Sequence, residues 1–111
     1  MPELPDGLVI EPVWLVEATY APDAAETRVP FRAEHITELA ARKAAGVYIE
    51  GGAFPDVSSS LILVRAASEP EALAIVGDDV YLRNGVWVEL RARPFGRVAR
   101  ASEVPGGAAG G

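Results

Sequence analysis

The sequence predicts a single-domain α+β fold with six elements in the order βαββαβ. Three observations lead to this prediction. Segments rich in β-branched and aromatic residues alternate with two segments whose apolar residues recur at helical spacing. Short runs that contain glycine or proline separate these segments. The length of 111 residues suits one domain, and an apolar share of 50% is typical of a globular chain.

The first half of the chain is predicted to contain a strand, a helix and a second strand. Residues 1–12 are acidic and interrupted by prolines, and we interpret them as an N-terminal arm. Residues 13–20 (VWLVEATY) are rich in strand-forming residues, and a loop bounded by prolines follows. Residues 31–45 have helical apolar spacing, and Gly46 is expected to end that helix. Residues 47–54 then form the second strand.

The second half repeats the pattern of strand, helix and strand. Residues 60–66 (SLILVRA) are the most apolar run and predict a central strand. Residues 68–71 (SEPE) form a capping-box motif, which predicts a helix from there to about Val76. Residues 78–85 (DDVYLRNG) are expected to form a short irregular or helical turn. Residues 86–95 alternate between apolar and polar side chains, as a strand with one buried face does.

This order is that of the ferredoxin-like split βαβ, an antiparallel sheet with both helices on one face. The domain is predicted to span residues 13–98. Residues 99–111, most of which form the run ASEVPGGAAGG, lack an apolar period. We therefore expect them to form a disordered tail.

The other face of the sheet would then be uncovered in a monomer. Alternation along the last strand predicts that Trp87 lies on this face, together with Leu15 and several charged residues. A large apolar side chain on an open sheet usually marks a partner surface, so we expect a homodimer formed through the sheet face. Alternatively, the charged residues keep this face in solvent and Trp87 is half exposed.

Composition excludes several classes of function. A net charge of −6 and the lack of a basic patch predict no nucleic-acid partner. The absence of cysteine excludes disulfides, thiolate metal sites and cysteine nucleophiles, and a single histidine excludes a histidine-rich metal site within one subunit. No apolar run approaches the roughly 20 residues of a membrane-spanning helix, and the acidic N-terminus lacks a signal core. We therefore expect a cytoplasmic protein with no membrane partner, metal or cofactor.

The only histidine, His35, lies near the start of the first predicted helix. If Ile36 is the centre of the buried stripe, helical spacing places His35 at the flank of that stripe, on the same side as Arg32. A side chain at the flank borders the core and stays partly exposed to solvent, which suits a group that titrates near neutral pH. An ordinary boundary histidine without chemistry would occupy the same position.

A histidine that acts as a general base usually has an acidic partner that orients it. Asp78 and Asp79, in the turn after the second helix, are the best candidates. Two helices on one sheet face pack side by side, so the end of one approaches the start of the other when they run antiparallel. Aspartates also start turns by bonding their own backbone, and this is the alternative role for both residues.

Several short motifs together resemble the YciI-like family over about residues 13–95. Their order and spacing carry the resemblance: Arg32-x-x-His35-Ile36, Gly46, Gly51-Gly52, Ser68, Glu71-Ala72, Asp79-Val80-Tyr81, Gly85-Val86 and Arg93-Pro94-Phe95. Val80 departs from the proline usual in that family, which makes the aim of the Asp79 carboxylate less constrained. The segment between the second and third strands is short, which implies a more open site.

The resemblance implies a dimeric ferredoxin-like α+β barrel with a site centred on His35 and Asp79, and with Arg32 and Tyr81 as its neighbours. It implies cofactor-free proton transfer of lyase or isomerase type, similar to a dehydrochlorinase, on a small carboxylated or enolic molecule. His35 would be the acid or base, Asp79 would fix its tautomer, and Arg32 would hold an anionic group. Two alternatives stay open, a non-catalytic ligand-binding or scaffold domain and a cofactor-free monooxygenase or cyclase.

Overall fold

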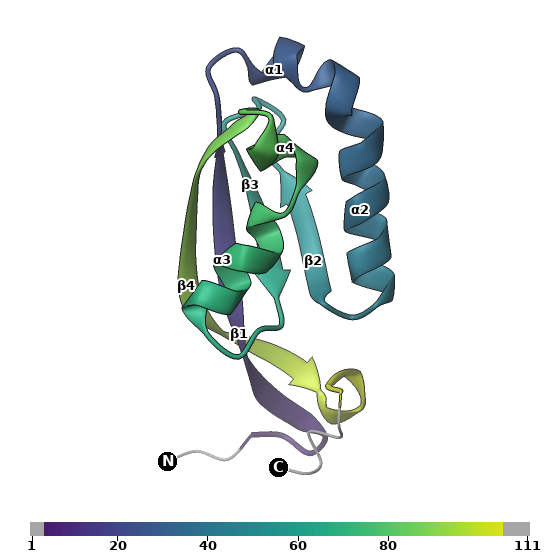
Figure 1. Cartoon of the computed structure of the whole chain (residues 1–111). Helices are drawn as coiled ribbons and strands as arrows, with labels where there is room; N and C mark the ends of the chain where they lie inside the picture. The colour runs from purple at the N-terminus through teal and green to yellow at the C-terminus, as the bar shows by residue number, and fades with distance from the viewer. Residues whose placement is uncertain (1–3, 106–111) are drawn as a thin grey trace.

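The computed structural model describes residues 4–105, which form one four-stranded antiparallel sheet in the order β2-β3-β1-β4 (Figure 1). The strands are β1 (Leu8–Tyr20), β2 (Tyr48–Ala53), β3 (Ser59–Val64) and β4 (Trp87–Arg100). The helices are α1 (Ala24–Thr27), α2 (Arg32–Ala44), α3 (Glu69–Gly77) and α4 (Val80–Arg83), with 3-10 turns η1 (Val29–Phe31) and η2 (Ala101–Glu103). This arrangement confirms the predicted α+β, ferredoxin-like split βαβ.

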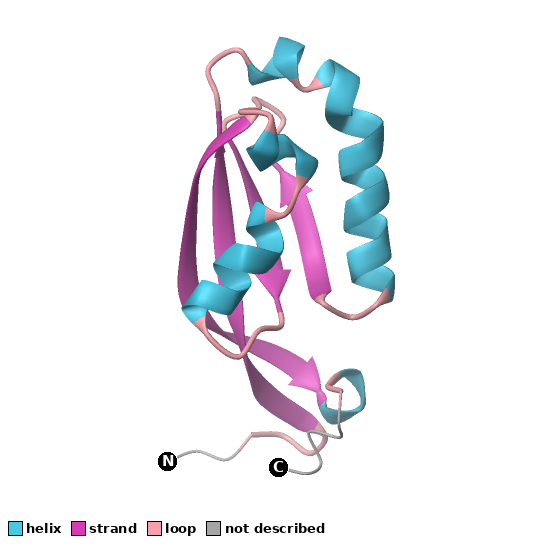
Figure 2. Ribbon diagram, in the orientation of Figure 1, coloured by secondary structure: helices cyan, strands magenta, loops and turns pink. Residues whose placement is uncertain are grey.

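The two longer helices, α2 and α3, lie on the same face of the sheet (Figure 2). In β3, Ile62 and Val64 are buried towards these helices, whereas Leu61 and Leu63 alternate to the opposite face. No helix of the described part of the chain covers that opposite face. It carries an apolar hollow of about 480 Å³, lined in part by Leu15, Leu61, Leu63 and Phe95.

Helix α2 starts and ends within one residue of the prediction, and Gly46 follows it with a φ of +80°, a conformation that suits glycine. The predicted orientation of the helix is wrong. Ile36 is 50% exposed, and His35 is the buried residue of the helix. The buried side is therefore turned by one residue, because His35 finds polar and aromatic partners in the core. The predicted loop before this helix also contains α1 and η1.

Helix α3 begins as predicted, because the Ser68 hydroxyl accepts a hydrogen bond from the Glu71 amide at 3.3 Å. The predicted turn after it contains the short helix α4, which Asp79 caps. Gly85 ends this turn with a φ of +72°. Within the described residues, no helix combines the length and the apolar character needed to cross a bilayer.

The prediction that Trp87 lies on the open sheet face is wrong, because the side chain is only 1% exposed. The cause is a β-bulge between β1 and β4. Tyr20 pairs with Trp87 but Thr19 pairs with Glu89, so Val88 has no partner on β1 and is 58% exposed. The bulge turns Trp87 to the helix-covered face, which simple alternation along the strand does not predict.

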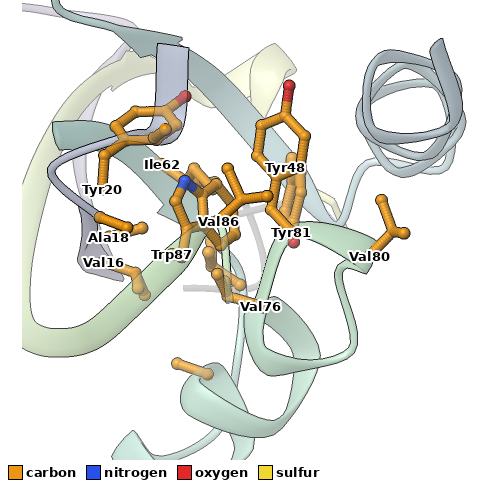
Figure 3. Packing of buried hydrophobic residues seen from close by; sticks show 14 residues of the cluster. Val16, Ala18, Tyr20, Tyr48, Ile62, Val76, Val80, Tyr81, Val86 and Trp87 are labelled. Atoms are coloured by element: carbon orange, nitrogen blue, oxygen red, sulfur yellow. The ribbon is translucent and has the colours of Figure 1, made fainter. Parts of the chain in front are cut away.

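Trp87 therefore belongs to the hydrophobic core, together with Val86 (Figure 3). Its indole meets the Tyr20 ring edge-on at 6.3 Å and the Tyr81 ring at 5.6 Å, measured between ring centroids. Edge-to-face contacts of this kind are favourable for aromatic pairs. The aromatic part of the core thus lies directly beneath α4 and the start of α2.

The predictions of an N-terminal arm and a C-terminal tail are wrong for the residues of the two segments that belong to paired strands. β1 already begins at Leu8, and β4 continues to Arg100, so residues 8–12 pair with residues 96–100. The two strands continue as a two-stranded ribbon beyond the body of the sheet (Figure 1). Ala99 is buried and η2 follows it, so the chain is ordered here. Residues 1–3 and 106–111 of the predicted arm and tail lie outside the described residues.

A partly buried ionic cluster joins this ribbon to the body. The Glu11 carboxylate accepts from Arg65 Nε at 2.6 Å and from Arg97 Nη1 at 3.0 Å. Arg65 also donates to the carbonyls of Gly46 and Glu103. The hydrogen bond from Arg65 is the main cause that lowers the pKa of the Glu11 carboxyl below its ordinary value of 4.5.

We expect Glu11→Gln to lower the free energy of unfolding at pH 7 by about 1–3 kcal/mol, because two guanidinium groups lose a charged partner. Since the pKa of Glu11 is lower in the folded state, its contribution is present above the unfolded pKa and is lost as the pH falls through the folded pKa. The difference between the variant and the wild type is therefore expected to shrink in acid. Urea denaturation at pH 7 and pH 3 measures this. Glu50→Gln, which breaks only the exposed pair with Lys43, is the control and should cost less. Equal effects of both changes would contradict the role of the cluster.

Candidate functional site

A cleft of about 350 Å³ lies between α2, the β2–β3 turn and the aromatic core. The helix side contributes Arg28, Arg32 and His35, and the β2 side contributes the bare backbone of Gly51 and Gly52. The Tyr81 ring also lines the cleft. A volume of this size is at the small end for ligand pockets, so the cleft suits a small molecule.

His35 and Asp79 form a buried pair at this cleft. Both carboxylate oxygens of Asp79 lie 2.9 Å from His35 Nδ1. The two residues are 4% and 3% exposed, respectively. Because an unpartnered polar group in such a place is costly, each side chain serves as the hydrogen-bond partner of the other. The two residues are 44 positions apart in the chain and are brought together by α2 and α4.

The fold aims the Asp79 carboxylate through the first turn of α4. Asp79 is the N-cap of that helix, and its Oδ1 accepts from the Tyr81 amide at 2.8 Å. Val80, where a proline is usual in the family that the motifs resemble, has a free amide, and this amide donates to Glu38 Oε1 at 3.2 Å. The Asp79 carboxylate therefore still points at His35 although Val80 replaces proline, because the N-cap hydrogen bond of Asp79 and the bond from Val80 to Glu38 both hold the turn.

Two aromatic rings hold the imidazole of His35 in place. The Tyr81 ring stacks on it with a centroid distance of 3.8 Å and an interplanar angle of 8°. Trp87 meets its edge at 5.2 Å. The stacked and edge-on rings, together with the Asp79 carboxylate, fix the orientation of the imidazole.

The pairing with Asp79 also assigns the proton of the neutral imidazole. A carboxylate accepts hydrogen bonds only, so Nδ1 must carry the hydrogen, and Nε2 is left with its lone pair. Within the described residues, His35 Nε2 makes no hydrogen bond. This nitrogen is also absent from the set of fully buried side-chain atoms without a hydrogen-bond partner. Because His35 lines the cleft, Nε2 is the ring atom from which a proton can move to or from a bound molecule.

Arg32 and Tyr81, the other two predicted site residues, also line the cleft. Burial raises the pKa of the Tyr81 hydroxyl, and Tyr20 adds to this, whereas Arg28 and Arg32 act in the opposite sense. The phenol therefore stays protonated and able to donate at neutral pH. All four predicted residues lie at one place, and their roles in catalysis and binding stay a prediction.

Sequence reasoning missed Arg28, Ser60 and Glu38. Arg28 and Ser60 line the cleft, and Glu38 supports α4. Arg28 precedes Arg32 by four residues in the chain, but it lies in the segment that was predicted to be a loop. In the part of the chain that the structure describes, no three histidine, aspartate or glutamate side chains converge in a way that could hold a metal ion.

The β2–β3 turn forms one rim of the cleft through Phe54 and Pro55. In this turn Val57 has a φ of +58°, which is strained for a β-branched residue. Its amide donates to the Phe54 carbonyl at 2.9 Å, and its side chain packs against the core. The strained residue is thus held by its surroundings at the edge of the site, where such conformations are often found.

Comparison with known proteins adds a family and a structural neighbour. A family model described as the YCII-related domain matches residues 13–96. A solved structure of 5-chloro-2-hydroxyhydroquinone dehydrochlorinase (TftG) from Burkholderia phenoliruptrix AC1100, in complex with 2,5-dihydroxybenzoquinone, has a similar fold with a TM-score of 0.63. The two chains are 20% identical, and the alignment covers 73% of this chain and 90% of that one. Among curated proteins, no match is found.

Proposed function

The chain belongs to the YCII-related domain family, and on that premise we propose that it is a cofactor-free enzyme of lyase or isomerase type. It transfers a proton on a small carboxylated or enolic molecule. The observation that carries this proposal is the His35–Asp79 pair, with Nδ1 held by the carboxylate and the ring at the wall of a small cleft.

His35 acts as the general base in the proposed reaction. Its Nε2 takes a proton from the bound molecule, and the imidazolium that forms is stabilised by the Asp79 carboxylate and by the face of Tyr81. The same nitrogen then returns the proton to another atom in an isomerisation, or keeps it until a leaving group has departed in an elimination. Asp79 keeps the ring oriented throughout.

Arg32 holds the negative charge of the substrate. Its guanidinium lines the cleft one helical turn before His35, and it can grip a carboxylate or an enolate oxygen through two parallel hydrogen bonds. Such a group also stabilises the negative charge that grows on the substrate after the proton leaves. The protonated Tyr81 hydroxyl supplies a further donor in the cleft.

The structural neighbour suggests a compound with which to begin. It is named for dehydrochlorination of 5-chloro-2-hydroxyhydroquinone, which is the removal of a proton and a chloride ion from a small hydroxylated ring. Such a ring belongs to the enolic class that the cleft, the base and the arginine suit. We therefore propose this compound as the first trial substrate.

The functional test compares the wild type with His35→Gln. We expect the wild type to release chloride from 5-chloro-2-hydroxyhydroquinone, or to exchange deuterium from solvent into 2-oxobutyrate or 2-oxoglutarate, faster than buffer does. His35→Gln should reduce either rate to that of buffer, because the base is lost. Glu34→Gln, the preceding residue on the outer side of α2, is the control. A His35→Gln variant as active as the wild type would contradict the proposal.

We also propose that the protein forms a homodimer through the open sheet face. The apolar hollow around Leu15, Leu61 and Leu63 supports this, because an isolated sheet seldom leaves such a patch in water. Gly51 and Gly52 line both this hollow and the cleft, so a partner seated on the sheet would lie next to the site.

Light scattering is expected to show a particle of about twice 11.7 kDa. Leu63→Arg should convert the dimer to a monomer, because it buries a charge without a partner at the contact. Val29→Arg places the same charge on an exposed apolar residue of η1 and is expected to leave the dimer intact. A wild-type monomer at micromolar concentration would contradict this proposal.

A further inference from the structure

The cleft carries two guanidinium groups, from residues four positions apart in the chain. Arg28 and Arg32 both line it, and the chain between them keeps helical backbone angles where it passes from α1 through η1 into α2. Both residues therefore bring a positive charge to the same small space, although no single α-helix runs through them.

Neither arginine has an acidic partner among the described residues. Several other arginines do, since Arg42, Arg65, Arg83 and Arg97 each lie within 4.0 Å of a carboxylate. The described residues that line the cleft include no aspartate or glutamate. Two like charges that line one small cleft repel each other, and they stand here in a chain whose net charge is −6. An anion in the cleft would neutralise it.

Both guanidinium groups also lie close enough to the Tyr81 hydroxyl to act on its pKa, and both lower it. Because Tyr81 stacks on the imidazole of His35 and all four residues line one cleft, the two positive charges lie at the same space that Nε2 borders. The imidazolium formed during proton transfer pairs with the Asp79 carboxylate, so the charge of the two guanidinium groups is left for the substrate. One acidic group on the substrate would leave part of this charge without a counterion.

We propose that Arg28 is a specificity-determining residue and that the substrate is a small dianion with two acidic groups. Arg32 holds one acidic group, Arg28 holds the other, and the atom that loses the proton lies near His35 Nε2. This inference rests on the proposed function, because it names the substrate class of that same site.

The test uses fumarate and crotonate, which share a four-carbon skeleton and differ in that a methyl group replaces one carboxylate. Binding to the full chain is followed by the NMR signals of the single imidazole. The wild type is expected to bind fumarate about tenfold more tightly than crotonate or better, as one more charged hydrogen-bonded pair predicts. Arg28→Gln should remove this preference and leave the crotonate affinity unchanged, whereas Arg32→Gln should weaken both ligands.

Two further variants complete the design. Arg28→Lys keeps the charge but loses the planar fork, and it is expected to retain part of the preference for fumarate. Arg83→Gln, outside the cleft on α4, should leave both affinities as they are in the wild type. Equal affinities of the wild type for the two acids, the lack of fumarate binding, or a preference that survives in Arg28→Gln would overturn the inference. If fumarate is preferred through Arg28 but no proton exchange or chloride release occurs, the proposed enzyme function fails, and only the selection of a dianion by Arg28 stands.

Discussion

Asp79→Asn is expected to leave the fold in place and to reduce turnover by about three to four orders of magnitude, as the corresponding change does in catalytic triads. Asparagine is as good an N-cap as aspartate, so α4 keeps its first turn. The Tyr81 amide still needs an acceptor, and it will take the amide oxygen of the new side chain. The NH₂ group is then left facing His35 Nδ1.

This geometry reverses the tautomer of His35. An NH₂ group donates, so Nδ1 must supply the lone pair and the ring proton moves to Nε2. The atom that faces the cleft then carries hydrogen and can no longer act as a base. Turnover is measured with whichever of the two reactions, chloride release or deuterium exchange, the wild type catalyses, and folding is checked by circular dichroism.

Asp78→Asn is the matched control for this prediction. Asp78 is the adjacent residue, but its carboxylate is exposed and pairs with Arg42 away from the imidazole. We expect it to retain the turnover of the wild type. An Asp79→Asn variant that folds and keeps more than about a tenth of the wild-type turnover would exclude a role for Asp79 in fixing the tautomer.

Trp87→Ala is expected to cause the largest loss of stability, about 3–5 kcal/mol in the free energy of unfolding. The indole is fully buried and contacts the rings of Tyr20, Tyr81 and His35, so its removal leaves a cavity under the site. Because His35 loses one of its two aromatic supports, turnover should also fall.

Val88→Ala, one position along β4, separates this effect from a general sensitivity of the strand. The bulge leaves Val88 exposed, so its truncation should change the free energy of unfolding by less than about 0.5 kcal/mol. Urea denaturation measures both variants. A larger loss of stability in Val88→Ala than in Trp87→Ala would contradict the bulge, which places Trp87 in the core and Val88 in solvent.

The order of elements could be predicted from the sequence, because each depends on local chemistry. Some signals affect only the few residues around them in the chain. These are the capping serine at residue 68, the glycines at residues 46 and 85, and the apolar run of β3. The bulge at Trp87 depends on how two strands, far apart in the chain, come into register. The ribbon of residues 8–12 and 96–100 likewise exists only because the two segments pair, since neither has a clear apolar period alone.

The candidate site shows the same division. Asp79 could be predicted as a turn residue, and the resemblance to a family paired it with His35. The depth of His35 could not be predicted from helical spacing, which favoured Ile36 as the buried residue. A histidine is buried when a carboxylate and an aromatic ring meet it, and here both come from α4 and its cap, more than forty residues away in the chain. Arg28 escaped notice because its turn was interpreted as a loop.

The most direct test of the central claim is the long-range ¹H–¹⁵N spectrum of the only imidazole in the wild type, recorded without and with 2,5-dihydroxybenzoquinone. Because the chain has a single histidine, all imidazole signals belong to His35. The neutral ring is expected to show a protonated Nδ1 and an unprotonated Nε2, and the added enolic ligand should change the Nε2 signal in a saturable way. A neutral ring protonated at Nε2, or signals that the ligand leaves unchanged, would contradict a proton-transfer role for His35 at this cleft.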